Sequence, residues 1–383
     1  MRFQLTVLPG AFAALAAACA VPFNDVRLLH NKTLLHEAIE QHRQAQARLP
    51  NGPQTGWAHA VQAGNPYQPW PDDLDGIVRV RYCYRSAKVE ADLKPSVDKG
   101  WRLWQDRLGE AGAASGHALE WVRYSKDGRF PPCRVNDEPV DASTWNPEVP
   151  FEIVEVASIE DVFYEGRATV GYLAPKWEMS DSLAGRHNLY LNTKLLSSWV
   201  GEHEDYAVAT AAHEMGHIFG LWHEHQRRDR DKYIYFECAN LPGYDEVRKK
   251  VEAEGKYSMN TICTDATLGF DYDFPAYEFS THRRGYLDPE LTWYPNRVRN
   301  SKGYDLESIM HYSSIAPGSG DDVNAAVLTA WVKDGPDVGR GRIIKRNTRI
   351  SELDRRAIQM IYPWRDGPLP SELPAPECEE VYC

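Results

Sequence analysis

The chain has 383 residues, of which 43% are hydrophobic and 26% are charged, a composition typical of a globular protein rather than a disordered one. This length is enough for one large catalytic domain with processing segments, or for two ordinary domains. The formal net charge is −12 at pH 7 and there is no long basic run, which argues against nucleic acid and an anionic membrane surface as partners.

The chain begins with a segment typical of a signal peptide. An apolar stretch, residues 4–20, follows Arg2 and ends in the small residues Ala-Cys-Ala at 18–20. The stretch is too short for a membrane span, so we expect cleavage after residue 20 and secretion from the cell. Cys19 leaves one alternative open, attachment of a bacterial lipid, although Ala16 occupies the place where a bulky aliphatic residue is preferred.

Residues 21–70 resemble a propeptide and linker. A short stretch with helical character, residues 33–49, is followed by a run rich in Pro, Gly and Gln. Such a composition is typical of loops between folded segments. We therefore expect the catalytic domain to begin at about residue 71.

The next segments predict a sheet with a helix packed on it. Residues 77–84 alternate apolar and basic side chains, which indicates a half-buried strand. Residues 96–110 place Val97, Trp101, Trp104 and Leu108 on one helical face before Gly109. Further strands are predicted at residues 119–124, 151–157, 168–173 and 188–192.

The segment HEMGHIFGLWHEHQRRDRD, residues 213–231, holds four of the thirteen histidines of the chain. A helix is predicted to end near residue 219, and on it His213 and His217 lie on one face, one turn apart. Gly220 can adopt the left-handed conformation that ends a helix and turns the chain back. His223 can then supply a third nitrogen at the same point.

These residues predict a catalytic zinc site, with one Zn²⁺ per chain. Three imidazoles leave the fourth coordination position open for water, whereas a structural zinc site usually has four protein ligands. Glu214 follows His213 directly, so its carboxylate can take a proton from the metal-activated water and later return it. A lone histidine is more often a hydrogen-bonded core residue, but the full HExxHxxGxxH is the extended metzincin pattern.

Two motifs are similar to the astacin family of zinc endopeptidases. The pattern HExxHxxGxxHExxRxDRD is matched over residues 213–231, and residues 308–312 read SIMHY. The resemblance implies a methionine turn that places Met310 beneath the metal ligands. It also implies that Tyr312 stabilises the oxyanion and is a possible additional ligand, and that Glu224 binds the new N-terminus after activation. Standing alone, SIMHY would be read as an ordinary core strand.

The resemblance also implies the fold. We expect an α+β (mixed α/β) zincin-like domain over residues 71–365, with a cleft that holds the zinc ion. Its upper lobe would contain a twisted, mostly parallel sheet with helices, and its lower lobe would be irregular and end in a helix at about residues 350–364. Residues 168–173 would form the edge strand that pairs with an extended substrate. A Pro- and Glu-rich tail, residues 366–383, would follow.

Six cysteines remain after removal of the signal peptide, and an even number in a secreted chain predicts that they form three disulfides. Six cysteines can be connected in fifteen ways. Proximity along the chain favours the pairs Cys238–Cys263, Cys378–Cys383 and Cys83–Cys133.

The chain departs from the astacin pattern in several places. His223 and Met310 are 87 residues apart, a long spacing that implies an inserted segment, for which residues 278–303 are a candidate. The predicted propeptide lacks the FxGD motif of the family, so the resemblance supplies no latency mechanism. The cysteine positions also differ from the usual family bridges.

The sequence therefore predicts a secreted zinc-dependent metalloendopeptidase, a monomer that acts on proteins or peptides. Because protonated imidazole cannot bind a metal, we expect activity to be lost in mild acid. Two alternatives stay open. One is a secreted binding protein that keeps a structural zinc on the same scaffold, and the other is a metzincin outside the astacins.

Overall fold

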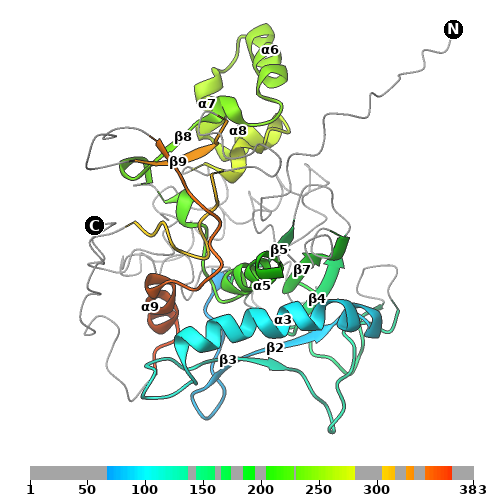
Figure 1. The fold of residues 1–383 in the computed structure, drawn as a ribbon. Coiled ribbons are helices and arrows are strands. Elements are labelled where there is room, and N and C mark those ends of the chain that lie inside the picture. Colours follow the sequence, from blue (N-terminus) through cyan, green and yellow to red (C-terminus); the bar gives the residue numbers. More distant parts are fainter. Residues whose placement is uncertain are drawn as a thin grey trace, which may run out of the picture.

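The structure, a computed structural model, describes residues 67–136, 144–159, 165–173, 184–194, 204–227, 230–280, 304–314, 325–331 and 341–364. The predicted signal peptide, nearly all of the predicted propeptide and the C-terminal tail lie outside these residues. Figure 1 shows two parts, which we call the sheet region (residues 67–218) and the second region (residues 224–344). Among the described residues, no helix has the length and apolar character needed to cross a membrane.

The sheet region contains a five-stranded sheet in the order β3-β2-β4-β7-β5. Its strands are β2 (Val78–Tyr84), β3 (Leu119–Arg123), β4 (Val154–Ile159), β5 (Gly166–Ala168) and β7 (Asn188–Asn192). Strands β3, β2, β4 and β7 are parallel, and β5 pairs antiparallel with β7 at the edge. The predicted mixed α/β fold with a mostly parallel sheet is confirmed.

The strand predicted at residues 168–173 is divided in two. Its first part overlaps the edge strand β5, and Gly171, with φ 61°, separates this from β6 (Tyr172–Leu173). Strand β6 pairs antiparallel with β1 (Tyr67–Gln68) rather than with the main sheet. The N-terminal end of the described chain therefore lies beside the edge of the sheet region.

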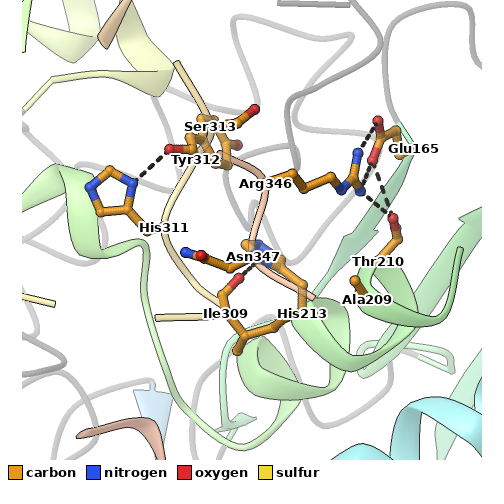
Figure 2. Close-up of a pocket in the computed structure, with 10 residues that line it drawn as sticks. All are labelled: Glu165, Ala209, Thr210, His213, Ile309, His311, Tyr312, Ser313, Arg346 and Asn347. Carbon is orange, nitrogen blue, oxygen red and sulfur yellow. Dashed lines mark hydrogen bonds and ion pairs between the residues drawn. The ribbon is translucent and has the colours of Figure 1, made fainter. Parts of the chain in front are cut away.

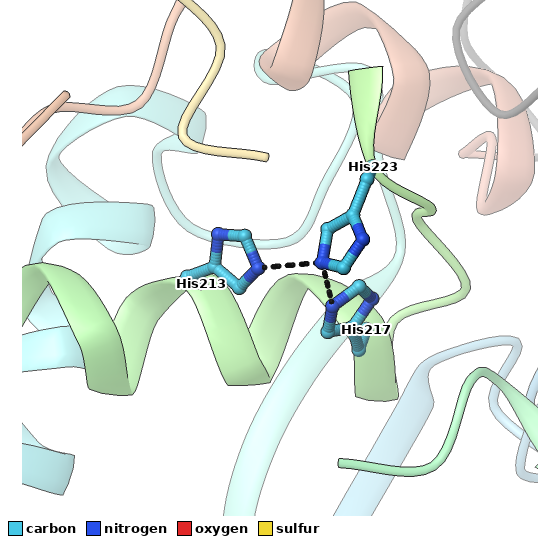
Figure 3. Close-up of side chains that lie close together, drawn as sticks. All are labelled: His213, His217 and His223. Carbon is cyan, nitrogen blue, oxygen red and sulfur yellow. Dashed lines mark hydrogen bonds between the residues drawn. The ribbon is translucent and has the colours of Figure 1, made fainter. Parts of the chain in front are cut away.

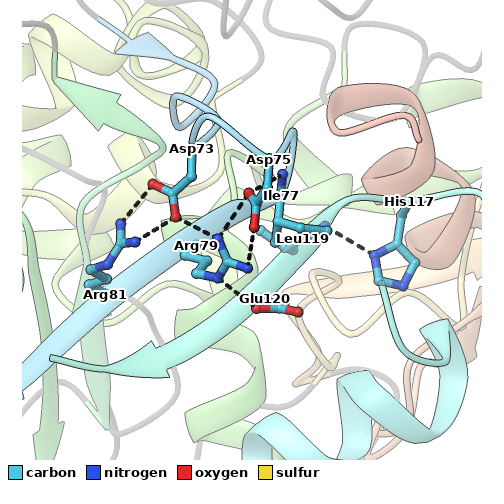
Figure 4. Close-up of polar contacts among 8 residues, drawn as sticks. All are labelled: Asp73, Asp75, Ile77, Arg79, Arg81, His117, Leu119 and Glu120. Atoms are coloured by element: carbon cyan, nitrogen blue, oxygen red, sulfur yellow. Dashed lines mark hydrogen bonds and ion pairs between the residues drawn. The ribbon is translucent and has the colours of Figure 1, made fainter. Parts of the chain in front are cut away.

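A surface charge network holds the loop that leads into β2 (Figure 4). Arg79 contacts Asp73 at 2.7 Å and Asp75 at 2.7 Å, and Arg81 contacts Asp73 at 2.5 Å. Exposed ion pairs stabilise a protein by only about 0–1 kcal/mol each. Their role here is to fix the path of the chain between β1 and β2.

Helix α3 (Ala87–Leu108) covers the sheet and begins earlier than predicted. The hydroxyl of Ser86 accepts a hydrogen bond from the Val89 N–H at the start of the helix, and Gly109, with φ 81°, ends it. Its buried side includes Val97 and Trp104, as the sequence predicts. The helix continues through Pro95, which the predicted helix excluded.

Helix α5 (Glu204–Ile218) lies against α3, and its small side chains allow a close approach. A Cβ atom placed on Gly100 of α3 would lie 3.0 Å from the Cβ of Ala211. The indole N–H of Trp104 donates to the Ala212 carbonyl at 2.8 Å. The helix predicted to end near residue 219 is thus present and is anchored in the core.

The second region contains more regular structure than the irregular lobe that we expected. A small antiparallel sheet has the order β10-β9-β8, formed by β8 (Ile234–Phe236), β9 (Leu328–Trp331) and β10 (Gly341–Ile343). Three helices accompany it, α6 (Tyr244–Glu254), α7 (Met259–Thr264) and α8 (Ala266–Asp271). Short 3-10 helices occupy Glu224–Gln226, Arg230–Lys232, Cys238–Asn240 and Pro275–Glu278. Part of the long segment between His223 and Met310 is therefore helical. Residues 281–303 lie outside the described residues.

Two of the predicted disulfides are present, and the last helix has the predicted position. Cys83 bonds to Cys133, and Cys238 bonds to Cys263. The pair predicted between the last two cysteines of the chain lies outside the described residues. Helix α9 (Glu352–Ile361) begins with a capping box formed by Ser351 and Asp354.

Candidate metal centre

Three histidine side chains converge at the C-terminal end of α5 (Figure 3). The Nε2 atom of His223 lies 3.0 Å from Nε2 of His217 and 3.2 Å from Nε2 of His213. Three nitrogens bound tetrahedrally to one zinc ion at about 2.0–2.1 Å would be about 3.3 Å apart. The ligand atoms of the three side chains all lie within 4.8 Å of one another, which is close enough for them to hold one ion. All three side chains are buried.

Backbone carbonyls orient two of the rings. Nδ1 of His213 lies 2.6 Å from the Ile309 carbonyl oxygen, and Nδ1 of His217 lies 2.8 Å from the Leu221 carbonyl oxygen. A carbonyl oxygen can only accept, so each Nδ1 carries the proton and each Nε2 presents its lone pair to the cluster. The fold thus selects the tautomer that can bind a metal.

Burial keeps the first of these rings neutral. Loss of solvation lowers the pKa of His213 to about 4, although the hydrogen bond to Ile309 acts in the opposite direction. An exposed imidazole has a pKa near 6.5. Burial thus favours the neutral form of this ring, which is the form that binds a metal.

The third histidine reaches the cluster through a tight turn. Gly220 has φ 99°, which favours glycine, and its N–H donates to the His217 carbonyl at 2.8 Å. The Leu221 N–H donates to the Gly216 carbonyl at 2.9 Å. These two bonds end α5 and turn the chain so that His223 approaches the face occupied by the other two rings.

Met310 packs against α5 at Gly216. Its side chain is fully buried, and a Cβ atom placed on Gly216 would lie only 2.5 Å from its Sδ. Gly216 stands between His213 and His217 on α5. The absence of a side chain at this position therefore allows the thioether to touch the helix backbone.

Glu214 is fully buried and lies under the edge strand of the sheet. A Cβ atom placed on Gly166, the first residue of β5, would lie 2.7 Å from Oε1 of Glu214. Sequence reasoning did not single out Gly166. A glycine in a strand can mark a place where another group approaches the backbone closely. The glycine itself was therefore the feature of the sequence that could have indicated this contact.

Tyr312 packs against the cluster and is 7% exposed. Its ring centroid lies 4.5 Å from that of His223 and 4.1 Å from that of His225. The Nε2 atom of His225 lies 3.1 Å from the Glu278 carbonyl oxygen. The fourth histidine of the segment, to which the sequence assigned no role, therefore supports the tyrosine ring.

Comparison with known proteins agrees with this geometry. Residues 198–276 match the family model described as Astacin, a peptidase family. This segment is therefore similar to the astacin family. Tolloid-like protein 2 of Homo sapiens is 40% identical over 85 residues, which are 21% of this chain and 8% of that protein. Bone morphogenetic protein 1 of Xenopus laevis is 39% identical over 93 residues, 23% of this chain and 12% of that protein. The chain therefore matches only a small part of these relatives.

A shorter relative and two solved structures extend the comparison. Astacin-like metalloprotease toxin 5 of Loxosceles gaucho is 31% identical over 81 residues, 20% of this chain and 44% of that protein. High choriolytic enzyme 1, a hatching enzyme zinc-protease from Oryzias latipes, has a TM-score of 0.41 at 15% identity, covering 80% of this chain and 96% of that chain. The structure of myroilysin has a TM-score of 0.34 at 15% identity, covering 77% and 96%. These TM-scores are low, so the similarity to astacins depends on the sequence match.

The arginines of the astacin segment build the second region rather than the cluster. Arg227 donates to Oε1 of Glu224 at 2.6 Å, and the Asp305 N–H donates to the same oxygen at 2.9 Å. Arg230 donates to the carbonyls of His225 and Phe279. Asp229 lies outside the described residues.

A pocket opens beside the histidine cluster (Figure 2). His213, Tyr312, Arg346 and Glu165 form part of its lining. Arg346 donates to Oε1 of Glu165 at 2.8 Å and to the Thr210 hydroxyl at 2.6 Å. Sequence reasoning assigned no role to the two charged residues, because they come from segments 181 residues apart.

Proposed function

We propose that the protein is a secreted, zinc-dependent metalloendopeptidase of astacin type. His213, His217 and His223 would hold one Zn²⁺, and Glu214 would act as general base and then general acid. The observation that carries the proposal is the convergence of three Nε2 atoms, 3.0 and 3.2 Å apart, within a segment similar to the astacin family.

The donor set fits a catalytic zinc ion. Neutral imidazole nitrogen is a preferred zinc ligand, and three protein ligands leave a position for water, whereas structural sites usually have four. Bound there, the ion would supply a positive charge that polarises a peptide carbonyl and makes water acidic enough to attack near neutral pH. The carbonyl contacts of His213 and His217 orient these two ligands before any ion binds.

Glu214 would move the proton that the reaction requires. Glu214 follows His213 directly on α5, and its carboxylate would accept a proton from the attacking water. A carbon–oxygen bond to the peptide carbonyl forms, the carbon–nitrogen bond breaks, and Glu214 would give the proton to the leaving amine. Gly166 provides the space in which the carboxylate lies.

The surrounding residues would hold the substrate. The phenol of Tyr312 would donate a hydrogen bond to the carbonyl oxygen as negative charge develops there. Strand β5 lies at the edge of the sheet and over Glu214, so its outer edge would pair with an extended peptide backbone. The pocket beside His213 would accept a substrate side chain next to the scissile bond.

The remaining segments complete the proposal. Residues 1–20 would direct secretion, the following segment would be a propeptide, and residues 366–383 would form a tail after the catalytic domain. The two disulfides of the described chain are in accord with an oxidising compartment. The mature protein would be a monomer that acts on protein or peptide substrates.

Substitution of Glu214 tests the proposal. We expect Glu214→Gln to lower kcat/KM for cleavage of casein by roughly 10²–10⁴-fold, because the proton transfer is lost while side-chain volume is kept. Zinc content should stay at one per chain, and a chelator should abolish cleavage by the unaltered protein. Glu120→Gln, at a partly exposed position in β3, is the matched control and should leave cleavage unchanged.

Two results would contradict the proposal. Unaltered cleavage by Glu214→Gln would remove the assigned base from the mechanism. One zinc per chain without cleavage of any tested substrate would instead favour a binding protein that keeps the scaffold.

A further inference from the structure

The carbonyl of the last residue of α5 and that of the next residue receive hydrogen bonds from two distant segments. The final four C=O groups of a helix have no partner within the helix. The indole N–H of Trp70 donates to the Ile218 carbonyl at 2.7 Å, and the phenol of Tyr362 donates to the Phe219 carbonyl at 2.9 Å. The backbone N–H of Trp70 also donates to the Tyr362 hydroxyl at 3.4 Å, so the two residues contact each other.

These carbonyls directly precede the turn that carries His223 to the cluster. The turn begins at Gly220, and the Leu221 carbonyl accepts from Nδ1 of His217 at 2.8 Å. A shift of the Ile218–Phe219 peptide would therefore move both the carbonyl that orients one ring and the chain that delivers another.

Trp70 is held firmly in the core, 6% exposed. Its ring packs against both His187 and Tyr172, with centroid distances of 4.7 and 5.2 Å. The two residues of β1, Tyr67–Gln68, pair with the backbone of β6 just before it. The chain from residue 67 onward is therefore integrated into the sheet region, although the sequence placed residues up to 70 in the propeptide and linker.

Tyr362 is held in a comparable way at the other end of the domain, and it is 2% exposed. It follows α9, and its N–H donates to the Ile358 carbonyl at 2.9 Å. Its own carbonyl accepts from the Ala118 N–H at 2.9 Å. Contacts on both sides thus fix the phenol where it reaches the end of α5.

We propose that Trp70 and Tyr362 are positioning residues of the metal centre, which fix the turn that delivers His223. The inference rests on the proposed zinc site but not on the proposed peptidase reaction. It implies that residues 67–70 belong to the catalytic domain. Any cut that releases the propeptide must then fall before Tyr67.

Two conservative variants of the full chain test the role of the hydrogen bonds. Trp70→Phe and Tyr362→Phe each remove one donor and keep an aromatic ring. Trp145→Phe is the matched control, because Trp145 is also buried and donates to a carbonyl, that of Val149, at 2.7 Å. It packs in a separate cluster beside the Cys83–Cys133 disulfide.

The readouts are the rate of zinc release to a chromogenic chelator and the unfolding of the metal-free protein. Loss of contacts that orient ligands lowers metal affinity by roughly 10–100-fold, so we expect about tenfold faster zinc release from Trp70→Phe and Tyr362→Phe. Trp145→Phe should release zinc at the unaltered rate despite a comparable loss of stability. If the first two release zinc no faster than the control, their contacts serve stability alone and the inference is wrong.

The N-terminus of the zinc-bound mature protein gives a second test that requires no variant. Mass spectrometry should place this N-terminus at or before residue 67. A zinc-bound form that begins at residue 71 or later and releases zinc at the unaltered rate would overturn the inference. Failure of the peptidase proposal would be distinct, because it would appear as absent cleavage by the unaltered protein while the zinc readouts still hold.

Discussion

A buried carboxylate in the sheet region and one in the second region have opposite electrostatic surroundings. Glu155 of β4 is fully buried and accepts from Arg134 at 2.5 Å and Arg85 at 2.9 Å. Burial acts to raise its pKa, but the two arginines outweigh burial and hold the pKa below the usual value. Asp305 is buried close to Asp354 and Glu224, and burial and these two charges raise its pKa well above the usual value.

The two carboxylates therefore differ in the groups that surround them. In the sheet region, the buried carboxylate of Glu155 is paired with cations on neighbouring segments. Around Asp305, Glu224 is paired with a cation, Arg227.

Asp354 of α9 is instead held by a hydroxyl and a backbone group, since it accepts from the Ser308 hydroxyl at 2.6 Å and the Ile309 N–H at 2.8 Å. Ile309 in turn orients His213 through its carbonyl. Acidic groups are therefore held at some cost where they position the methionine turn.

The largest expected effect comes from neutralising the carboxylate of the sheet region. Glu155→Gln should lower the free energy of unfolding by roughly 3–5 kcal/mol at pH 7, because it leaves two arginines without their buried anion. Urea unfolding of the metal-free protein measures the change. Asp92→Asn, on an exposed ion pair with Lys88, is the control and should change stability by less than about 0.5 kcal/mol. A loss as small as that of the control would mean that this ion-pair network does not stabilise the sheet region.

An intermediate effect is expected where the two regions touch. Gly216→Ala should lower the free energy of unfolding by roughly 1–3 kcal/mol, because its Cβ would lie 2.5 Å from Sδ of Met310. Zinc release should also become faster, since the added methyl group stands between His213 and His217. Gly100→Ala, whose Cβ would lie 3.0 Å from that of Ala211, should affect stability but not zinc release. Equal zinc release from both variants would contradict the assigned contact between Met310 and α5.

The smallest change in the free energy of unfolding is expected for substitution of Asp305 in the second region, and it should be an increase. A carboxyl group with a raised folded-state pKa contributes stability below its unfolded pKa of 3.8, and this stability is lost as the pH rises through the folded value. Asp305→Asn should therefore raise the free energy of unfolding at pH 7–8, by on the order of 1 kcal/mol. At pH 3.5 the variant and the unaltered protein should be nearly equally stable. A loss of stability at pH 7–8 would show that the charged form is favoured there, contrary to the comparison.

The pH dependence of Glu155 should have the reverse form. Its pKa is lowered, so its contribution is present above its usual value of 4.5 and is lost as the pH falls through the folded value. The destabilisation caused by Glu155→Gln should accordingly become smaller in strong acid.

The two regions also differ in how far the sequence predicts them. Alternation over residues 77–84 and the helical face with Val97 and Trp104 report local periodicity, so β2 and the second half of α3 were predicted. The first half of α3 was missed because Pro95 removes a backbone donor. The helix continues because Val89 and Leu93 bury the same face as Val97, a gain that a local pattern does not reveal.

The candidate metal centre also contains a part that the sequence predicts and a part that it does not. The spacing of the three histidines and the glycine after them is local, and it predicted the cluster. The residues that support it come from distant segments, such as Trp70 and Tyr362, which are 292 positions apart and meet only in the folded chain. Such contacts form only when the segments that follow β1 and α9 meet at the end of α5, and no short sequence motif predicts this.

The most direct test of the account is the coordination of zinc in the purified protein, measured by X-ray absorption. The account predicts one zinc per chain with three imidazole nitrogens and at least one water oxygen at about 2.0–2.1 Å. It also predicts loss of one nitrogen, or of the metal, in His223→Ala. Four protein ligands, sulfur ligation or no zinc at all would contradict a catalytic centre built from His213, His217 and His223.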